Sequence, residues 1–178
     1  MCRARHTQLL AGDAFRCATS APEAGVIKDM EDDKIKIYPP LYMVGKKIHC
    51  WRCDTKMPVI ALLAPKAEDV EKQVCLLSGI TEIPKDVLSF IQERVPTFQF
   101  RYSKTVGGKY YANTCPKCKV IYGDFFLNDE PGAPFFPENV EDAKTLYLRE
   151  IPISSSVCIA ASVGIGVGEM IIENAIKL

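Results

Sequence analysis

The chain contains two cysteine pairs with identical spacing, and these pairs restrict its fold more than any other feature of the sequence. Cys50 and Cys53 are separated by two residues, as are Cys115 and Cys118, and 61 residues lie between the two pairs. Each Cys-x-x-Cys turn can offer two thiolates to one ion, so two turns supply the four sulfur ligands of a tetrahedral zinc site. The spacing therefore predicts one structural zinc ion that joins two distant parts of the chain.

The pair Cys50 and Cys53 also has an interpretation as a redox dithiol. A thioredoxin-like dithiol lies at the start of a helix, where the helix dipole lowers the pKa of the nucleophilic thiol. The segment after Cys53, DTKMPVIALLAP, instead has the apolar and β-branched residues of a strand. Zinc is therefore the preferred interpretation, and a thiol redox protein is kept as an alternative.

A site with four thiolates has no open position for water, so it stabilises a fold and is not expected to be catalytic. Zinc binding of about 10–16 kcal/mol would appear largely as folding free energy. His49 precedes Cys50 in an expected strand, so its side chain should point away from the ion. Trp51 and Arg52 lie inside the first pair and are candidate partner-binding residues.

Hydrophobic patterning predicts an α+β fold, with a small antiparallel sheet, zinc-ribbon-like paired knuckles and a helical insertion at about 65–95 between them. Residues 1–30 lack periodicity and are expected to form a poorly ordered extension to a single zinc-binding domain at 31–178. Strands are expected at 34–50 with a turn at Pro39 and Pro40, at 57–64, in a hairpin at 97–114 and at 145–154; helices are expected at 65–79, 83–96 and 169–178.

The expected location is the cytoplasm. The N-terminal apolar stretch is broken by Gly12, Asp13 and Arg16, so it does not resemble a signal peptide. Residues 151–168 are uncharged, but Pro152 and the glycines favour a buried strand and turn over a membrane span. In a reducing compartment paired cysteines more often bind metal than each other. Cys75 and Cys158 are expected to be small buried side chains.

Basic and acidic residues balance at 22 each, so only their distribution is informative. The segment 95–120 has no acidic residue and interleaves aromatic side chains with five basic ones, Arg101, Lys104, Lys109, Lys117 and Lys119. A basic hairpin with exposed aromatics is typical of single-stranded nucleic-acid binding. In the simpler and preferred interpretation the aromatic side chains form a core face, while the lysines offset the negative charge of the zinc site.

The segment 123–142 is acidic, with six Asp or Glu residues and no Lys or Arg. Asp124, Asp142 and Lys144 have the residue types of a metal-dependent nuclease, in which carboxylates hold magnesium and a lysine steadies the nucleophile. This segment, 124–144, supplies the enzymatic alternative. With His6 and His49 as the only histidines, the sequence offers no Cys-His or Ser-His catalytic arrangement.

The motifs CWRC, YYANTCPKC and GDFF resemble those of a group of uncharacterised bacterial proteins with paired zinc-ribbon or rubredoxin-like knuckles. The resemblance covers about residues 46–127 and implies that Cys50, Cys53, Cys115 and Cys118 bind metal, without implying an activity. Lys119 stands where such knuckles usually have a small residue. The sequence thus predicts a binding module with a structural zinc ion, and a protein or nucleic acid as its partner. Whether the chain is an enzyme stays open, with the balance against it.

Overall fold

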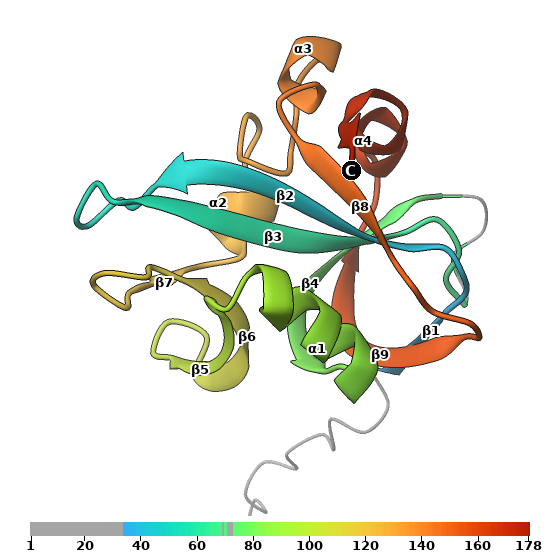
Figure 1. Cartoon of the computed structure of the whole chain (residues 1–178), viewed down its shortest axis with the longest axis horizontal. Helices are drawn as coiled ribbons and strands as arrows, with labels where there is room; N and C mark the ends of the chain where they lie inside the picture. The colour runs from blue at the N-terminus through green and yellow to red at the C-terminus, as the bar shows by residue number, and fades with distance from the viewer. Residues whose placement is uncertain (1–33, 69, 71–72) are drawn as a thin grey trace, which may run out of the picture.

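The computed structural model describes residues 34–68, 70 and 73–178, so the expected N-terminal extension lies outside the described residues. In Figure 1 the colour of each helix and strand follows the residue number, from blue near the N-terminus to red at the C-terminus. The strands are β1 (Lys34–Ile37), β2 (Leu41–His49), β3 (Lys56–Ala64), β4 (Cys75–Glu82), β5 (Phe98–Ser103), β6 (Gly108–Thr114), β7 (Ile121–Tyr122), β8 (Tyr147–Ile151), β9 (Val157–Gly164) and β10 (Ile176–Lys177). The helices are α1 (Lys85–Arg94), α2 (Phe125–Asn128), α3 (Val140–Ala143) and α4 (Gly168–Asn174).

The strands form two sheets. The larger has seven strands in the order β1-β9-β4-β3-β2-β8-β10, and the smaller has three in the order β5-β6-β7. All pairs are antiparallel except β8 with β10, which is parallel. The fold is therefore α+β, as the sequence predicts, but its main sheet is larger than expected.

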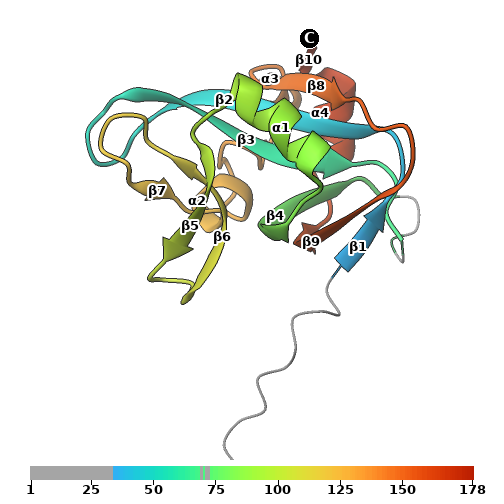
Figure 2. The same cartoon turned by 60° about the horizontal axis from the view of Figure 1, so that its bottom comes forward.

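The larger sheet is covered on both faces. Alternate residues of β3 enter different apolar clusters: Ile60 and Leu62 pack with Val87 and Ile91 of α1, whereas Leu63 packs with residues of α2 and α4. Figure 2 shows α1 against the sheet, with α4 beyond it near β8. Because both faces are covered, β3 is a nearly continuous apolar run rather than an alternating one.

The helix expected at 65–79 is wrong. The described residues between β3 and β4 contain no helix, and β4 begins at Cys75. Leu76 and Leu77 are both buried because they face opposite clusters of a sheet with two covered faces. In the described part of 65–95 the helical insertion is thus limited to α1, and the apolar spacing that suggested a first helix belongs in part to a central strand.

Most of the other expected elements are confirmed. The two strands around Pro39 and Pro40 are β1 and β2, and the strand expected at 57–64 is β3. The second expected helix is α1, the hairpin is β5 with β6, and the strand expected at 145–154 is β8. The uncharged segment 151–168 contains β9, which pairs with β1 and β4. The expected C-terminal helix ends at Asn174 and is followed by β10. Among the described residues no helix is both long and apolar enough to cross a membrane.

A buried asparagine joins the two sheets. The carboxamide of Asn113 on β6 accepts a hydrogen bond from the Ile60 N–H and donates one to the Ile60 carbonyl, both at 2.9 Å. In the register of β3 with β4, Leu62, Leu63 and Ala64 are the paired residues, so Ile60 lies beyond the paired segment. A side-chain amide has the same donor and acceptor as a peptide group. Asn113 therefore substitutes for a strand neighbour and fixes β6 against β3.

Candidate metal centre

The two cysteine pairs lie in turns at the ends of two hairpins. The first turn connects β2 to β3, and the second connects β6 to β7. In the first, the Cys50 N–H donates to the Thr55 carbonyl at 3.0 Å and the Asp54 N–H donates to the Cys50 carbonyl at 2.8 Å. In the second, the Cys115 N–H donates to the Val120 carbonyl at 2.9 Å and the Lys119 N–H donates to the Cys115 carbonyl at 3.1 Å. The two turns therefore have the same pattern of backbone hydrogen bonds.

The residue after each pair has a positive φ. Asp54 has a φ of 55° and Lys119 a φ of 60°, a left-handed conformation that is uncommon outside glycine. The Lys119 side chain folds back so that its ammonium group donates to the Pro116 carbonyl at 2.7 Å. Lys119, which departs from the small residue usual at this position, thus adopts the same backbone conformation as Asp54.

The four cysteine sulfurs form one compact group. All four Sγ atoms lie within 4.8 Å of one another, and the Cys50–Cys118 and Cys53–Cys115 Sγ distances are both 3.6 Å. A tetrahedral ion with metal–sulfur bonds of about 2.3 Å holds its sulfurs roughly 3.8 Å apart. A disulfide needs about 2.05 Å, and these cysteines are free. The group therefore has the chemistry and the size to hold one metal ion.

The surroundings of the sulfurs favour a bound cation. The Thr55 hydroxyl and backbone stabilise the thiolate of Cys53 and lower its pKa to about 6. Burial opposes ionisation of Cys115, but the backbone N–H groups of Cys118 and Lys117 outweigh it and lower its pKa. The Val120 N–H lowers the pKa of Cys118, yet burial and the neighbouring thiols raise it to about 11. Without a bound cation, the four adjacent thiols are therefore not all ionised. A divalent cation would displace the protons that remain on them.

The other residues of the first turn lie outside the sulfur group. His49 is exposed, and its Nδ1 lies 3.1 Å from both the carbonyl and Oδ1 of Asp54. Trp51 is 65% exposed and Arg52 is also exposed, so both can reach a partner. Cys75 is buried in the core as expected, although on a strand, whereas Cys158 is exposed and not buried as predicted. The exposure of Cys158 follows from its position near the start of β9, opposite Lys36 of β1.

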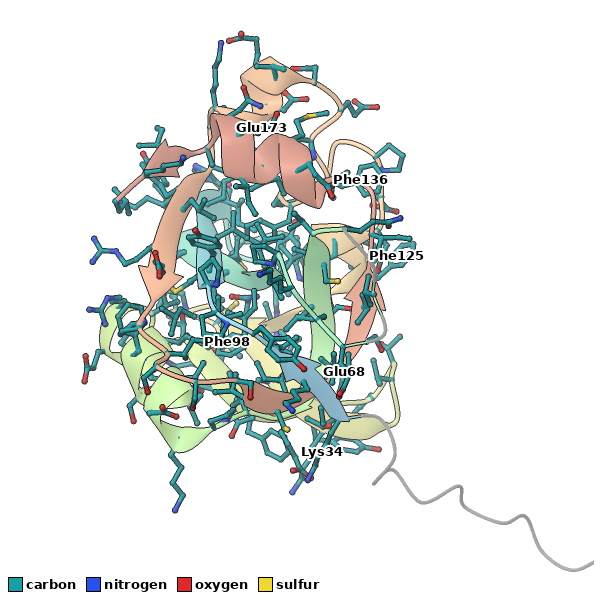
Figure 3. All side chains as sticks on the ribbon, turned by 90° about the vertical axis from the view of Figure 1, so that its right-hand side faces the viewer. Lys34, Glu68, Phe98, Phe125, Phe136 and Glu173 are labelled. Atoms are coloured by element: carbon teal, nitrogen blue, oxygen red, sulfur yellow. The ribbon has the colours of Figure 1, made fainter. Side chains whose placement is uncertain are left out.

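The preferred interpretation of the basic hairpin is only half correct. Phe98 and Tyr110 are buried, but Phe100 and Tyr102 are 48% and 57% exposed. The register explains this: Phe98 lies opposite Asn113 at the sheet junction, whereas Tyr102 lies opposite Lys109 near the free tip. Figure 3 labels Phe98 together with Phe125 of α2, which lies at the edge of that view and is 57% exposed. The hairpin therefore exposes aromatic and basic side chains together.

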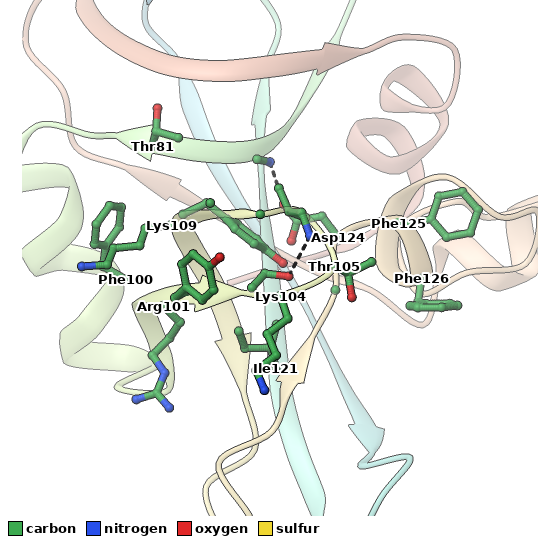
Figure 4. A pocket seen from close by; sticks show the side chains of 18 of the residues that line it. Thr81, Phe100, Arg101, Lys104, Thr105, Lys109, Ile121, Asp124, Phe125 and Phe126 are labelled. Carbon is green, nitrogen blue, oxygen red and sulfur yellow. Dashed lines mark hydrogen bonds between the residues drawn. The ribbon is translucent and has the colours of Figure 1, made fainter. Parts of the chain in front are cut away.

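These exposed side chains line a groove of about 1250 Å³ between the tip of the hairpin, β4 and the segment 119–126. Figure 4 shows Phe100 and Arg101 at one end of the groove, with Phe125 and Phe126 at the other. Trp51 of the first cysteine turn and Lys119 of the second also contribute to its wall. Arg52 and Lys117 are exposed but are not among the lining residues. The groove therefore extends from the cysteine turns to the hairpin tip.

The acidic residues of the nuclease alternative make separate structural contacts. Asp124 accepts a hydrogen bond of 2.6 Å from the Gly79 N–H, so it links the groove to β4. Asp142 accepts from the Glu138 N–H, and Lys144 bonds to Glu141 at 2.6 Å. Within the described residues, the metal-ligand group found is the four-cysteine group. No contact of these residues specifically favours a nuclease site.

The partly buried carboxyl of Asp124 gives a pH-dependent prediction. Burial raises its pKa to about 6, above the 3.8 of an unperturbed aspartate, although the Gly79 N–H opposes the shift. The native state therefore gains stability from this group as the pH falls from about 6 to about 4, and loses it as the pH rises. We expect Asp124→Asn, which keeps an acceptor for Gly79, to stabilise the protein at pH 7 by about 1–3 kcal/mol.

Urea unfolding of both proteins between pH 4 and 7 tests this expectation. The difference in unfolding free energy between Asp124→Asn and the wild type should shrink towards pH 4, where Asp124 is protonated in the native state and partly protonated in the unfolded state. Acid release of metal from the cysteines affects both proteins equally and cancels in the difference. A constant difference across this range would show that the carboxyl is not perturbed.

Comparison of the chain with protein-family models, with curated proteins and with solved structures gave no match. Its function is therefore argued from the geometry of its own residues. Sequence reasoning found the four cysteines from their spacing, but it missed Asn113 and the contact of Asp124 with β4. The sequence does contain one indication of the role of Asn113, because a polar amide is unusual inside a strand.

Proposed function

We propose that the protein is a non-catalytic binding module in which Cys50, Cys53, Cys115 and Cys118 hold a structural zinc ion. The observation that carries this proposal is the convergence of four free thiols from two hairpins within 4.8 Å. Four thiolates fill a tetrahedral coordination shell, so the ion would have a stabilising role and no position for a substrate. The module would present its surface to a protein or a nucleic acid.

We also propose that the two turns are knuckles of the zinc-ribbon or rubredoxin type. Their matching backbone hydrogen bonds and the positive φ of Asp54 and Lys119 support this part of the proposal. Cys50 and Cys115 belong to the apolar cluster on one face of the larger sheet. A bound ion would therefore cross-link the two hairpins beside this apolar cluster.

Metal analysis of protein purified under reducing conditions tests the proposal. We expect about one zinc ion per chain. Cobalt(II) added to the chelator-treated protein should give the visible absorption of a tetrahedral thiolate site, and zinc should then displace it. Cys158→Ser is the matched control, because Cys158 is exposed and lies outside the sulfur group.

Three outcomes would contradict the proposal. Protein without metal, in which reducible disulfides join the four cysteines, would favour the thiol redox alternative. Bound iron that cycles between two oxidation states would favour electron transfer, since tetrahedral sulfur sites also suit iron. Hydrolysis of nucleic acid that depends on magnesium and is lost in Asp142→Ala would favour the nuclease alternative.

A further inference from the structure

We propose that the groove beside the cysteine turns binds single-stranded nucleic acid. This inference rests on the proposed function, because it names the partner of the same metal-stabilised surface. The groove, as defined above, is lined by residues of both cysteine turns, the β5–β6 hairpin, β4 and the segment 119–126. Its volume of about 1250 Å³ exceeds the roughly 300–1,000 Å³ of a small-molecule pocket, so an extended ligand fits it better.

The charge of the groove favours an anionic ligand. Its cationic lining residues are Arg101, Lys104, Lys109 and Lys119, and all four are exposed. Within the described part of the chain, no ion pair involves any of these four side chains. The two acidic lining residues are already engaged: Glu82 pairs with Lys34 at 2.7 Å, and Asp124 accepts the Gly79 N–H. Among the described residues, Arg101, Lys104 and Lys109 are therefore free to contact phosphates. The Lys119 ammonium group donates to the Pro116 carbonyl and keeps two further N–H donors for a phosphate.

The aromatic residues supply the second requirement. Five large aromatic side chains of the lining are between 48% and 65% exposed: Trp51, Phe100, Tyr102, Phe125 and Phe126. Figure 4 shows Phe100 at one end of the groove and the two phenylalanines of α2, Phe125 and Phe126, at the other. Exposed rings in a basic groove are the elements on which successive bases stack. An acidic peptide would use the cations but would leave these rings without partners.

Single strands fit this arrangement better than a duplex. Stacking on a protein ring requires an unpaired base face, which a duplex conceals inside its helix. The lining residues lie in a concave surface and on a hairpin tip, and no helix of the described residues presents a basic face to a major groove. We therefore expect sequence-tolerant binding that depends strongly on salt.

Fluorescence anisotropy of labelled 12-nucleotide oligo(dT) and oligo(U) with metal-loaded protein tests the proposal. Contacts of four cations with phosphates predict a slope of log affinity against log salt of about −3. Arg101→Ala with Lys104→Ala should reduce this slope to about −1.5 and lower affinity at least about 10-fold in low salt. Lys85→Ala with Lys177→Ala is the charge-matched control outside the groove, and it should leave both quantities nearly unchanged.

A separate variant tests how much the aromatic side chains contribute to binding. Tyr102→Ala should weaken binding by about 5-fold to 150-fold without changing the salt slope, because stacking releases no counterions. Tyr147→Ala removes another exposed tyrosine, on β8 and outside the groove, and this variant should bind as the wild type does. Tighter binding of oligo(U) than of oligo(dT), or the reverse, would assign the site to RNA or to DNA.

Three results would overturn the inference. These are failure of the zinc-bound protein to bind either oligonucleotide, equal affinity for a duplex of the same length, and equal affinity for a 12-residue polyglutamate. In each case a chain that still holds zinc leaves the proposed metal function intact. Absence of zinc from the purified wild type would instead refute the metal proposal, whatever the oligonucleotides do.

Discussion

Replacement of Cys115 by serine is expected to remove most of the bound metal and to lower the Tm by about 10 °C or more. Cys115 is buried, and its sulfur lies 3.6 Å from that of Cys53, so its loss leaves three ligands from two hairpins. Serine can replace the volume of the thiol but is a poor ligand at neutral pH. Metal analysis and thermal unfolding monitored by circular dichroism measure both effects.

A comparison in chelator separates loss of metal from damage to the core. If Cys115→Ser acts through the metal, the variant and the wild type should unfold at similar temperatures once both are metal-free. Cys118→Ser provides a second test, because Cys118 is only half-buried and its replacement disturbs packing less. The control Cys158→Ser should keep its metal and its Tm. Variants of Cys115 and Cys118 that retain a full zinc ion would refute the proposed ligand set.

Replacement of Asn113 by alanine is expected to cost about 2–5 kcal/mol of unfolding free energy, because it leaves a buried N–H and a buried carbonyl unpaired. Both groups belong to Ile60, and Asn113 is 1% exposed, so water cannot easily replace the lost hydrogen bonds. Asn113 lies two residues before Cys115 in the chain. We therefore also expect zinc affinity to fall by about 10- to 100-fold, as for other residues that orient metal ligands.

Urea unfolding of the zinc-bound protein and competition with a chromophoric chelator measure these two effects. Asn174→Ala is the matched control, because Asn174 donates one hydrogen bond to the Met170 carbonyl within α4 and is less buried. It should cost less than about 1 kcal/mol. An effect of Asn113→Ala no larger than that of Asn174→Ala would show that the two sheets do not depend on this amide.

Local sequence patterns predicted the elements whose signals lie within a few residues. Alternation identified the strands around Pro39 and Pro40, and the proline-bounded segment around Val87 and Ile91 identified α1. The same reasoning failed at β4, because a strand buried on both faces has no alternation to distinguish it from a helix. The pairing of β1 with β9 joins residues at least 120 positions apart, and no local pattern specifies such a partner.

The sequence predicted the part of the candidate site that depends on local spacing, but not the part that distant segments form together. Each cysteine pair is recognisable locally, because two residues separate Cys50 from Cys53 and Cys115 from Cys118. The groove combines segments around Thr81, Tyr102 and Phe125 that meet only in the folded chain. Whether an aromatic side chain such as Tyr102 is buried depends on its register near a free hairpin tip, which the sequence pattern alone does not determine.

Trp51 gives the protein a built-in optical reporter. It is the only tryptophan of the chain, it lies between two of the proposed ligands, and it lines the groove. Indole emission excited selectively at long wavelength therefore arises from this single position. Emission from the unlabelled wild type should respond both to filling of the sulfur group and to stacking of a base on the ring. One titration with zinc followed by one with an oligonucleotide can thus monitor the two events in the same sample.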